Sequence, residues 1–155
     1  MRKEALAALV GYFKNQRKVI DDLVQSIRPV TPAGPENTSH LGYLLHNLYC
    51  AVEDLFRYVS LTFENTIADT AKYHRELLKR MHIEVPEIRP RVISEASFRL
   101  LDELRGFRHV FRHAYEFQLA PEKVADLKGK VLARWQGIEQ DFDAFVGFLV
   151  TEMHR

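Results

Sequence analysis

Apolar residues that recur every third or fourth position constrain the fold of this chain more than any other feature. The pattern covers residues 2–27, 38–65, 94–119 and the chain from residue 121 onward. Such spacing places apolar side chains on one face of an α-helix. There is no clear strand pattern and no clear internal repeat. The pattern therefore predicts an all-α fold.

Helix-ending residues separate these segments. Prolines break the chain at residues 28–38 and again at residues 83–93, and a shorter charged helix is expected over residues 70–82. Thr38 or Ser39 is expected to cap the second helix, Ser94 is expected to cap the third long helix, and Pro121 is expected to open the last. The third long helix is expected to stop at residues 116–119. We therefore expect an up-and-down bundle of four long helices and one short helix, forming a single domain over residues 1–155.

Composition narrows the possible functions. The chain has 155 residues, a formal net charge of +1 at pH 7 and one cysteine, Cys50. A nearly neutral protein is not a general polyanion binder, so nucleic-acid binding requires a local basic patch. One cysteine cannot form an intrachain disulfide, and no apolar stretch reaches membrane-spanning length. We expect a cytoplasmic protein that needs neither a cofactor nor a metal and does not bind membranes.

The second predicted helix is apolar on more than one side, which is typical of a central helix with several neighbours. Its polar residues must then face gaps, a partner or solvent. Asn47, Glu53, Asp54 and Arg57 are candidate supporting residues, because a carboxylate there could orient a basic residue of a neighbouring helix. For most of them a solvated strip is the favoured interpretation. His74 is expected to be a surface histidine.

Arginines and histidines gather at the end of the third long helix. Arg108 and His113 are the main candidates, and Arg105, His109 and Arg112 are candidates for extending an RNA- or phosphate-binding surface. Arginine binds phosphate oxygens in a fork geometry, and histidine titrates near neutral pH. At about 100° per residue, Arg108 and His113 lie about 140° apart on a straight helix. Either the helix unwinds at its end, or a second copy supplies one group across a two-fold axis.

Arg108, His113 and Tyr115 form the pattern Arg-x4-His-x-Tyr. At the end of the third long helix of a five-helix chain, this pattern resembles the motif of the HEPN superfamily (higher eukaryotes and prokaryotes nucleotide-binding domains), and in particular of the HepT toxins. The Leu-Arg-Gly-Phe stretch before the motif and the Pro-Glu-Lys-Val stretch after it add to the resemblance. One departure is His109, which stands where many members have asparagine.

The resemblance implies a metal-independent endoribonuclease that acts as a homodimer and is the toxin of a type VII toxin–antitoxin pair. Arg108 and His113 would be its catalytic residues. Its substrate would be RNA, with tRNA as one candidate, and attack by the 2′-hydroxyl group would leave DNA uncut. The cognate antitoxin, a small MntA-like nucleotidyltransferase, would silence the toxin by transferring AMP to Tyr115.

Three other interpretations stay open. Cations near a helix C-terminus are favoured by the helix dipole and need no function. His109, His113 and Glu116 could bind a divalent metal, although no accompanying motif supports this. A non-catalytic HEPN helper subunit would bind nucleotide or a nucleotidyltransferase partner, and the intact pair of Arg108 and His113 argues against it.

Overall fold

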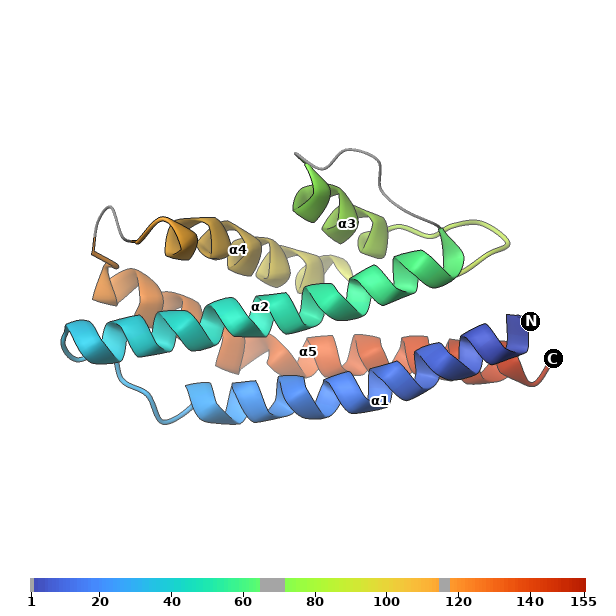
Figure 1. The fold of residues 1–155 in the computed structure, drawn as a ribbon, viewed down its shortest axis with the longest axis horizontal. Helices are drawn as coiled ribbons and strands as arrows, with labels where there is room; N and C mark the ends of the chain where they lie inside the picture. Colours follow the sequence, from blue (N-terminus) through green and yellow to red (C-terminus); the bar gives the residue numbers. More distant parts are fainter. Residues whose placement is uncertain (1, 65–71, 115–117) are drawn as a thin grey trace.

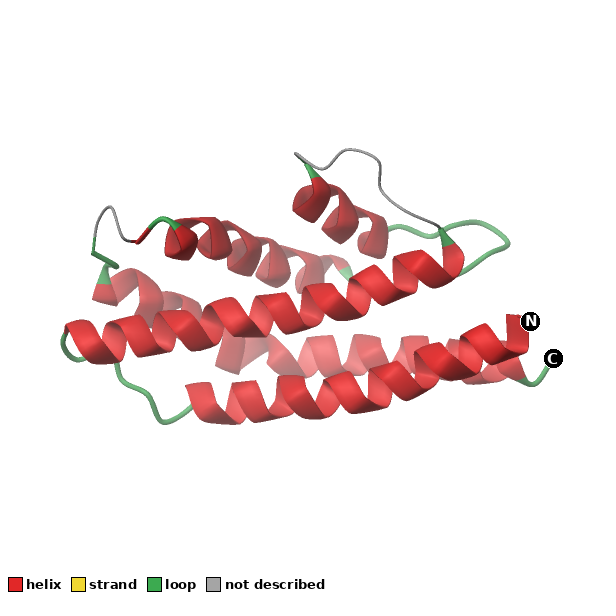
Figure 2. Ribbon diagram, viewed as in Figure 1, coloured by secondary structure: helices red, strands yellow, loops and turns green. Residues whose placement is uncertain are grey.

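In the part of the chain that the structure describes, five helices pack into a bundle (Figures 1 and 2). The computed structural model describes residues 2–64, 72–114 and 118–155. The helices are α1 (Arg2–Ile27), α2 (Pro35–Phe63), α3 (Tyr73–His82), α4 (Glu95–Arg112) and α5 (Pro121–Met153). Apart from one isolated bridge between Val85 and Arg89, the described residues contain no β-structure. The all-α prediction of four long helices and one short helix is confirmed.

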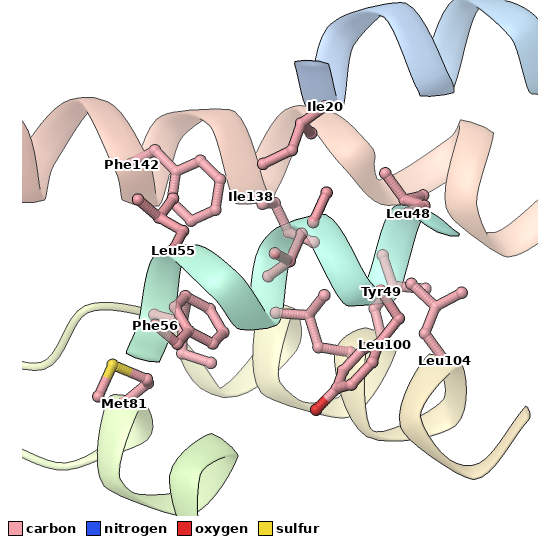
Figure 3. Close-up of a cluster of buried hydrophobic side chains, with 14 of the residues drawn as sticks. Ile20, Leu48, Tyr49, Leu55, Phe56, Met81, Leu100, Leu104, Ile138 and Phe142 are labelled. Atoms are coloured by element: carbon pink, nitrogen blue, oxygen red, sulfur yellow. The ribbon is translucent and has the colours of Figure 1, made fainter. Parts of the chain in front are cut away.

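The central element is α2, which packs against each of the other four helices. Its two apolar stripes face different neighbours. Leu48 and Leu55 point toward α5, whereas Tyr49 and Phe56 point toward α4 and α3 (Figure 3). All four side chains are buried in one core cluster. The central role predicted for this helix is therefore confirmed.

The longest helix, α5, closes the bundle beside α1, and the two chain ends lie at the same end of the molecule (Figure 1). The apolar face expected from residue 121 onward is confirmed, because the residues that recur at helical spacing are buried: Val124, Leu127, Val131, Trp135, Ile138, Phe142, Phe145 and Leu149. Of the described helices, none combines the length and apolar character that a membrane crossing needs.

Helix starts follow local chemistry, with one correction. Ser94 caps α4 as predicted, since its side chain accepts a hydrogen bond from the backbone N–H of Ser97. The prediction that Thr38 or Ser39 caps α2 is wrong, because α2 already begins at Pro35. Gly34 precedes it with φ of 89°, and proline favours the first helical position. The Thr38 hydroxyl instead donates to the Gly34 carbonyl at 2.8 Å.

The connection between α3 and α4 is held by one buried arginine. The side chain of Arg89 is fully buried and forms an ion pair with Glu64. It also donates to the backbone carbonyls of Arg80, Ile83 and Pro90 at 2.9–3.1 Å. Arg89 therefore fixes the loop that leads into α4.

Candidate functional site

The motif lies where α4 ends, and that end comes earlier than predicted. The helix stops at Arg112, so the prediction of an end at residues 116–119 is wrong. His113 is the C-cap residue, with φ of −106° and ψ of 13°, and its N–H donates to the Val110 carbonyl at 3.2 Å. Such a bond over three residues tightens a last turn and ends a helix. His113 thus follows the helix instead of continuing its straight face, and Tyr115 lies outside the described residues.

The first turns of α2 hold this end of α4. A Cβ atom on Gly42 would lie 2.8 Å from Cδ1 of Leu119 and 3.3 Å from the ring of Phe111. One turn further along α2, the imidazole of His46 stacks on the same Phe111 ring, with centroids 5.0 Å apart and planes at 27°. The absence of a side chain at Gly42 and the stacking at His46 together set where the last turn of α4 lies.

Arg108 faces a polar stretch of α2. It is half-buried, and its Nε atom is buried without a hydrogen-bond partner among the described residues. Burial, followed by the charges of Arg108 and Arg112, lowers the pKa of His46. The Nε2 atom of His46 lies 3.6 Å from Sγ of Cys50. Burial raises the pKa of the Cys50 thiol, although the nearby Arg108 opposes this shift.

Sequence reasoning did not select His46 or Cys50 as site residues. A usable signal exists, because residues 46, 50, 53 and 57 follow a spacing of four, three and four. This spacing places polar or titratable groups on one face of α2. That face could have been singled out in an otherwise apolar helix.

Glu53 is the buried member of this face. Nδ1 of His74 lies 2.8 Å from both carboxylate oxygens of Glu53, and Nη2 of Arg57 lies 3.5 Å from Oε1. Arg57 also donates from Nε to the hydroxyl of Tyr73 at 3.0 Å. Burial and the Glu53 carboxylate raise the pKa of Tyr49. The solvated interpretation is wrong for Glu53, and His74 is a half-buried partner from α3, not a purely surface residue.

The other predicted supporting residues are less enclosed. Asp54 is exposed and lies 3.5 Å from Nη1 of Arg57, whereas Asn47 is half-buried. Arg105 donates from Nε to Asp102 on its own helix at 2.9 Å. A solvated position thus fits Asp54, and Arg105 already has a carboxylate partner.

His109 and Arg112 extend the motif to the surface, where both are exposed. The rings of His109 and His113 lie 4.6 Å apart between centroids. Within residues 2–64, 72–114 and 118–155, no three histidine, cysteine or acidic side chains are grouped as metal ligands. Glu116, the third ligand of the metal interpretation, lies outside these ranges.

A cleft of about 480 Å³ adjoins the end of α4. It is lined by the start of α2, the end of α4 and the segment that enters α5: Gly34, Pro35, Thr38, Ser39, Phe111, Ala114, Gln118, Leu119 and Pro121. This size is in the range of small-molecule sites. The cleft is therefore large enough to admit a nucleotide-sized group beside the motif.

A family model described as HepT-like protein matches residues 40–149. The chain belongs to the HepT-like protein family. The curated proteins and the solved structures gave no significant match. Membership in the HepT-like family implies a toxin–antitoxin context, and this family typically contains HEPN ribonucleases.

The HepT-like match includes both sides of the site. It contains the polar face of α2 from His46 onward, the whole of α3 and α4, and the motif residues Arg108 and His113. The motif and the α2 face opposite it thus lie inside the part of the chain that the family model matches.

Proposed function

We propose that this HepT-like protein is the toxin of a type VII toxin–antitoxin pair and cuts RNA without a metal ion. The observation that carries the proposal is the arrangement at the end of α4. A half-buried arginine with no hydrogen-bond partner at Nε among the described residues precedes a helix end that carries His113. This arrangement offers a phosphate-binding cation and a proton-transfer group on one short segment.

The reaction needs only these two kinds of group. The 2′-oxygen of a ribose attacks the adjacent phosphorus, and the bond from phosphorus to the 5′-oxygen breaks. A histidine takes the 2′-hydroxyl proton or supplies a proton to the leaving 5′-oxygen. Arg108 binds the phosphate and stabilises the extra negative charge of the transition state. The products are a 2′,3′-cyclic phosphate and a 5′-hydroxyl, and DNA is not cut because it lacks the attacking group.

Surrounding residues have secondary roles in this proposal. Arg112 and His109 are exposed beside the motif and extend the RNA-binding surface together with Arg105. Glu53 and Arg57 support the α2 face that Arg108 meets, and Asn47 and Asp54 are weaker candidates for the same role. Substituting Arg112 should lower RNA affinity and its salt dependence more than it slows cleavage.

The proposed regulator is an MntA-like nucleotidyltransferase that adds AMP to Tyr115. Tyr115 follows Ala114, which lines the cleft at the end of α4. An AMP group on Tyr115, seven residues after Arg108 in the sequence, would add a bulky anion that competes with RNA for the positive charge of the motif. Tyr115 is then an acceptor for regulation, not a catalyst.

A second copy of the chain completes the proposed toxin. Val110, within the motif, is 40% exposed although it is apolar. Pairing two chains through this side of α4 would cover Val110 and place two copies of the motif around one cleft. Light scattering should then give the mass of a dimer, and Val110→Glu should shift it toward the monomer.

The deciding experiment is cleavage of total cellular RNA in EDTA. Wild type is compared with Arg108→Ala, His113→Ala and the matched control Arg99→Ala, an exposed arginine of α4 paired with Glu95. We expect cutting with cyclic-phosphate ends by wild type and Arg99→Ala only. Cleavage that needs a metal, ends with a 3′-hydroxyl or cutting of DNA would contradict the proposal.

Modification is tested in the same samples. Mass spectrometry should show one or more adenylates on Tyr115 when the cognate nucleotidyltransferase and ATP are present, and Tyr115→Phe should escape silencing while it still cuts RNA. If unmodified wild type does not cut RNA, the function shifts to a non-catalytic helper subunit that binds nucleotide or the nucleotidyltransferase.

A further inference from the structure

Two buried polar atoms without a partner lie on the facing sides of α2 and α4. Among the described residues, three buried side-chain atoms lack a hydrogen-bond partner: Nδ1 of His46, Nε of Arg108 and Nε1 of Trp135. The first two belong to residues that are linked through Phe111, because His46 stacks on its ring and Arg108 lies one turn before it on α4. Buried polar atoms are almost always hydrogen-bonded in folded proteins. Two exceptions at one site therefore need a physical reason.

The two atoms are complementary in chemistry. Burial and the cations Arg108 and Arg112 favour the neutral form of His46, which carries one N–H group and one lone pair. With the N–H group on Nε2, toward Sγ of Cys50 at 3.6 Å, the lone pair is on Nδ1. Arg108 Nε carries an N–H group and can only donate. His46 stacks on Phe111, which follows Arg108 by one turn of α4, so an unpaired acceptor and an unpaired donor lie on the same part of the contact between α2 and α4.

We propose that His46 is a positioning residue for Arg108. When an RNA phosphate binds, Nε–H of Arg108 donates to Nδ1 of His46, and the two Nη groups turn toward the phosphate oxygens. A guanidinium group recognises phosphate through a planar fork, so fixing its plane fixes the direction of both bonds. This inference rests on the proposed ribonuclease function and adds a residue that orients its phosphate-binding arginine.

The imidazole of His46 suits this role because a neighbouring aromatic ring fixes its orientation. Its ring stacks on Phe111, one turn beyond Phe107 on the same helix as Arg108. Among the described residues, Arg108 and Arg112 from α4 and Cys50 from α2 are the titratable groups that act on or contact His46. Protonating His46 would remove the acceptor and repel Arg108, so the pairing requires neutral His46.

The test separates stacking from hydrogen bonding. His46→Phe keeps an aromatic ring against Phe111 but has no acceptor, whereas His46→Asn places an amide oxygen close to the position of Nδ1. His82→Phe is the matched control, because His82 stacks on Phe98 at the opposite end of α4, with ring centroids 4.7 Å apart. All three variants are compared with wild type in kcat and KM for RNA cleavage across pH 5–9.

We expect His46→Phe to lower kcat by roughly tenfold or more, because misplaced catalytic groups cost rate more than affinity. His46→Asn should restore most of this loss and should lack the part of the acidic fall in activity that comes from protonating His46. His82→Phe should behave as wild type. If His46→Phe keeps the wild-type kcat and pH profile, the positioning role is wrong even though the ribonuclease function stands.

A binding measurement keeps the inference independent of turnover. The probe is a 2′-O-methyl RNA oligonucleotide, which cannot be cleaved by 2′-hydroxyl attack. On its addition, the Nε–H signal of Arg108 in nuclear magnetic resonance spectra should shift and become protected from exchange in wild type and His46→Asn, but not in His46→Phe. The same protection in His46→Phe would overturn the inference. Protection without any RNA cleavage would overturn the ribonuclease proposal alone.

Discussion

Arg89 and Arg108 are both at least half-buried, but they differ in how many of their hydrogen-bond donors have partners. Arg89 is fully buried, paired with Glu64 and bonded to three backbone carbonyls. Arg108 is half-buried, and its Nε atom has no partner among the described residues. One arginine is satisfied by the fold, and the other keeps an unused donor.

This difference in hydrogen bonding indicates a different role for each arginine. A buried charge with a complete set of partners holds a structure, because removing it leaves those partners unsatisfied. Removing an arginine that has an unused donor should cost little folding stability. In the intact protein, that donor is available to a ligand. The loop before α4 is therefore held by a structural arginine, whereas the arginine near the end of α4 belongs to the proposed binding site.

The largest effect on stability should come from Arg89→Ala. The change leaves the Glu64 carboxylate, whose side chain is 10% exposed, without its buried cation. Breaking such a pair costs about 3–5 kcal/mol of the free energy of unfolding. Urea denaturation measures this loss, and Arg91→Ala, an exposed neighbour, should change stability by only about 0.5 kcal/mol. Equal losses in the two variants would remove the structural role.

Arg108→Ala should lose much cleavage activity and little stability. Its cleavage rate should fall by about 10²–10³, as when one donor to a transition-state oxyanion is removed. Its free energy of unfolding should change by only about 1 kcal/mol or less, because no hydrogen bond to its Nε is lost. Arg108→Lys should not restore the rate, since an ammonium group lacks the planar fork. A loss of stability as large as that of Arg89→Ala would break the contrast.

Much of the bundle was predictable because amphipathic spacing acts within one helix. The buried face of α5 could be read residue by residue, and Ser94 could be recognised as a cap from its own chemistry. The early end of α4 could not be read in this way. It coincides with contacts of Phe111 and Leu119 with Gly42, which lies about seventy residues earlier in the sequence.

The candidate site could be proposed from the sequence only where its residues are neighbours in sequence. Arg108 and His113 form a local motif, and the family match supports the resemblance that this motif carries. The pairing of Glu53 with His74 and the stacking of His46 on Phe111 join different helices. Helical spacing says which face a residue occupies but not which helix meets that face, so these partners needed the structure.

A smaller effect should separate two glycines. A Cβ atom on Gly42 would press against Leu119 and Phe111, whereas one on Gly137 would meet nothing within 4 Å. Both changes to alanine gain about 1 kcal/mol of helix propensity, but overpacking at Gly42 costs about 1–3 kcal/mol. In denaturation experiments, the free energy of unfolding of Gly137→Ala should therefore exceed that of Gly42→Ala by the overpacking cost. Only Gly42→Ala should slow RNA cleavage. Equal stability and activity would mean that Gly42 does not set the end of α4.

The smallest effect is a dependence of stability on pH that His46 should contribute. Burial and the charges of Arg108 and Arg112 lower the pKa of His46 in the folded protein below the ordinary value of 6.5. As pH falls below about 6.5, the unfolded chain gains a proton at His46 before the folded protein does. Linkage then requires this contribution to stability to be complete above that pH and to be lost as pH falls through the folded pKa.

Urea denaturation at a series of pH values from 7.5 to 5 tests this sign. His46→Phe should be less sensitive to acid than wild type, because it lacks the titrating group. Arg108→Gln should lie between the two, because one of the charges that lower the pKa of His46 is gone while burial remains. Equal acid sensitivity in all three proteins would mean that Arg108 and His46 do not interact in the folded state. Arg108 would then differ from Arg89 only in having fewer partners, and not in being held ready beside an acceptor.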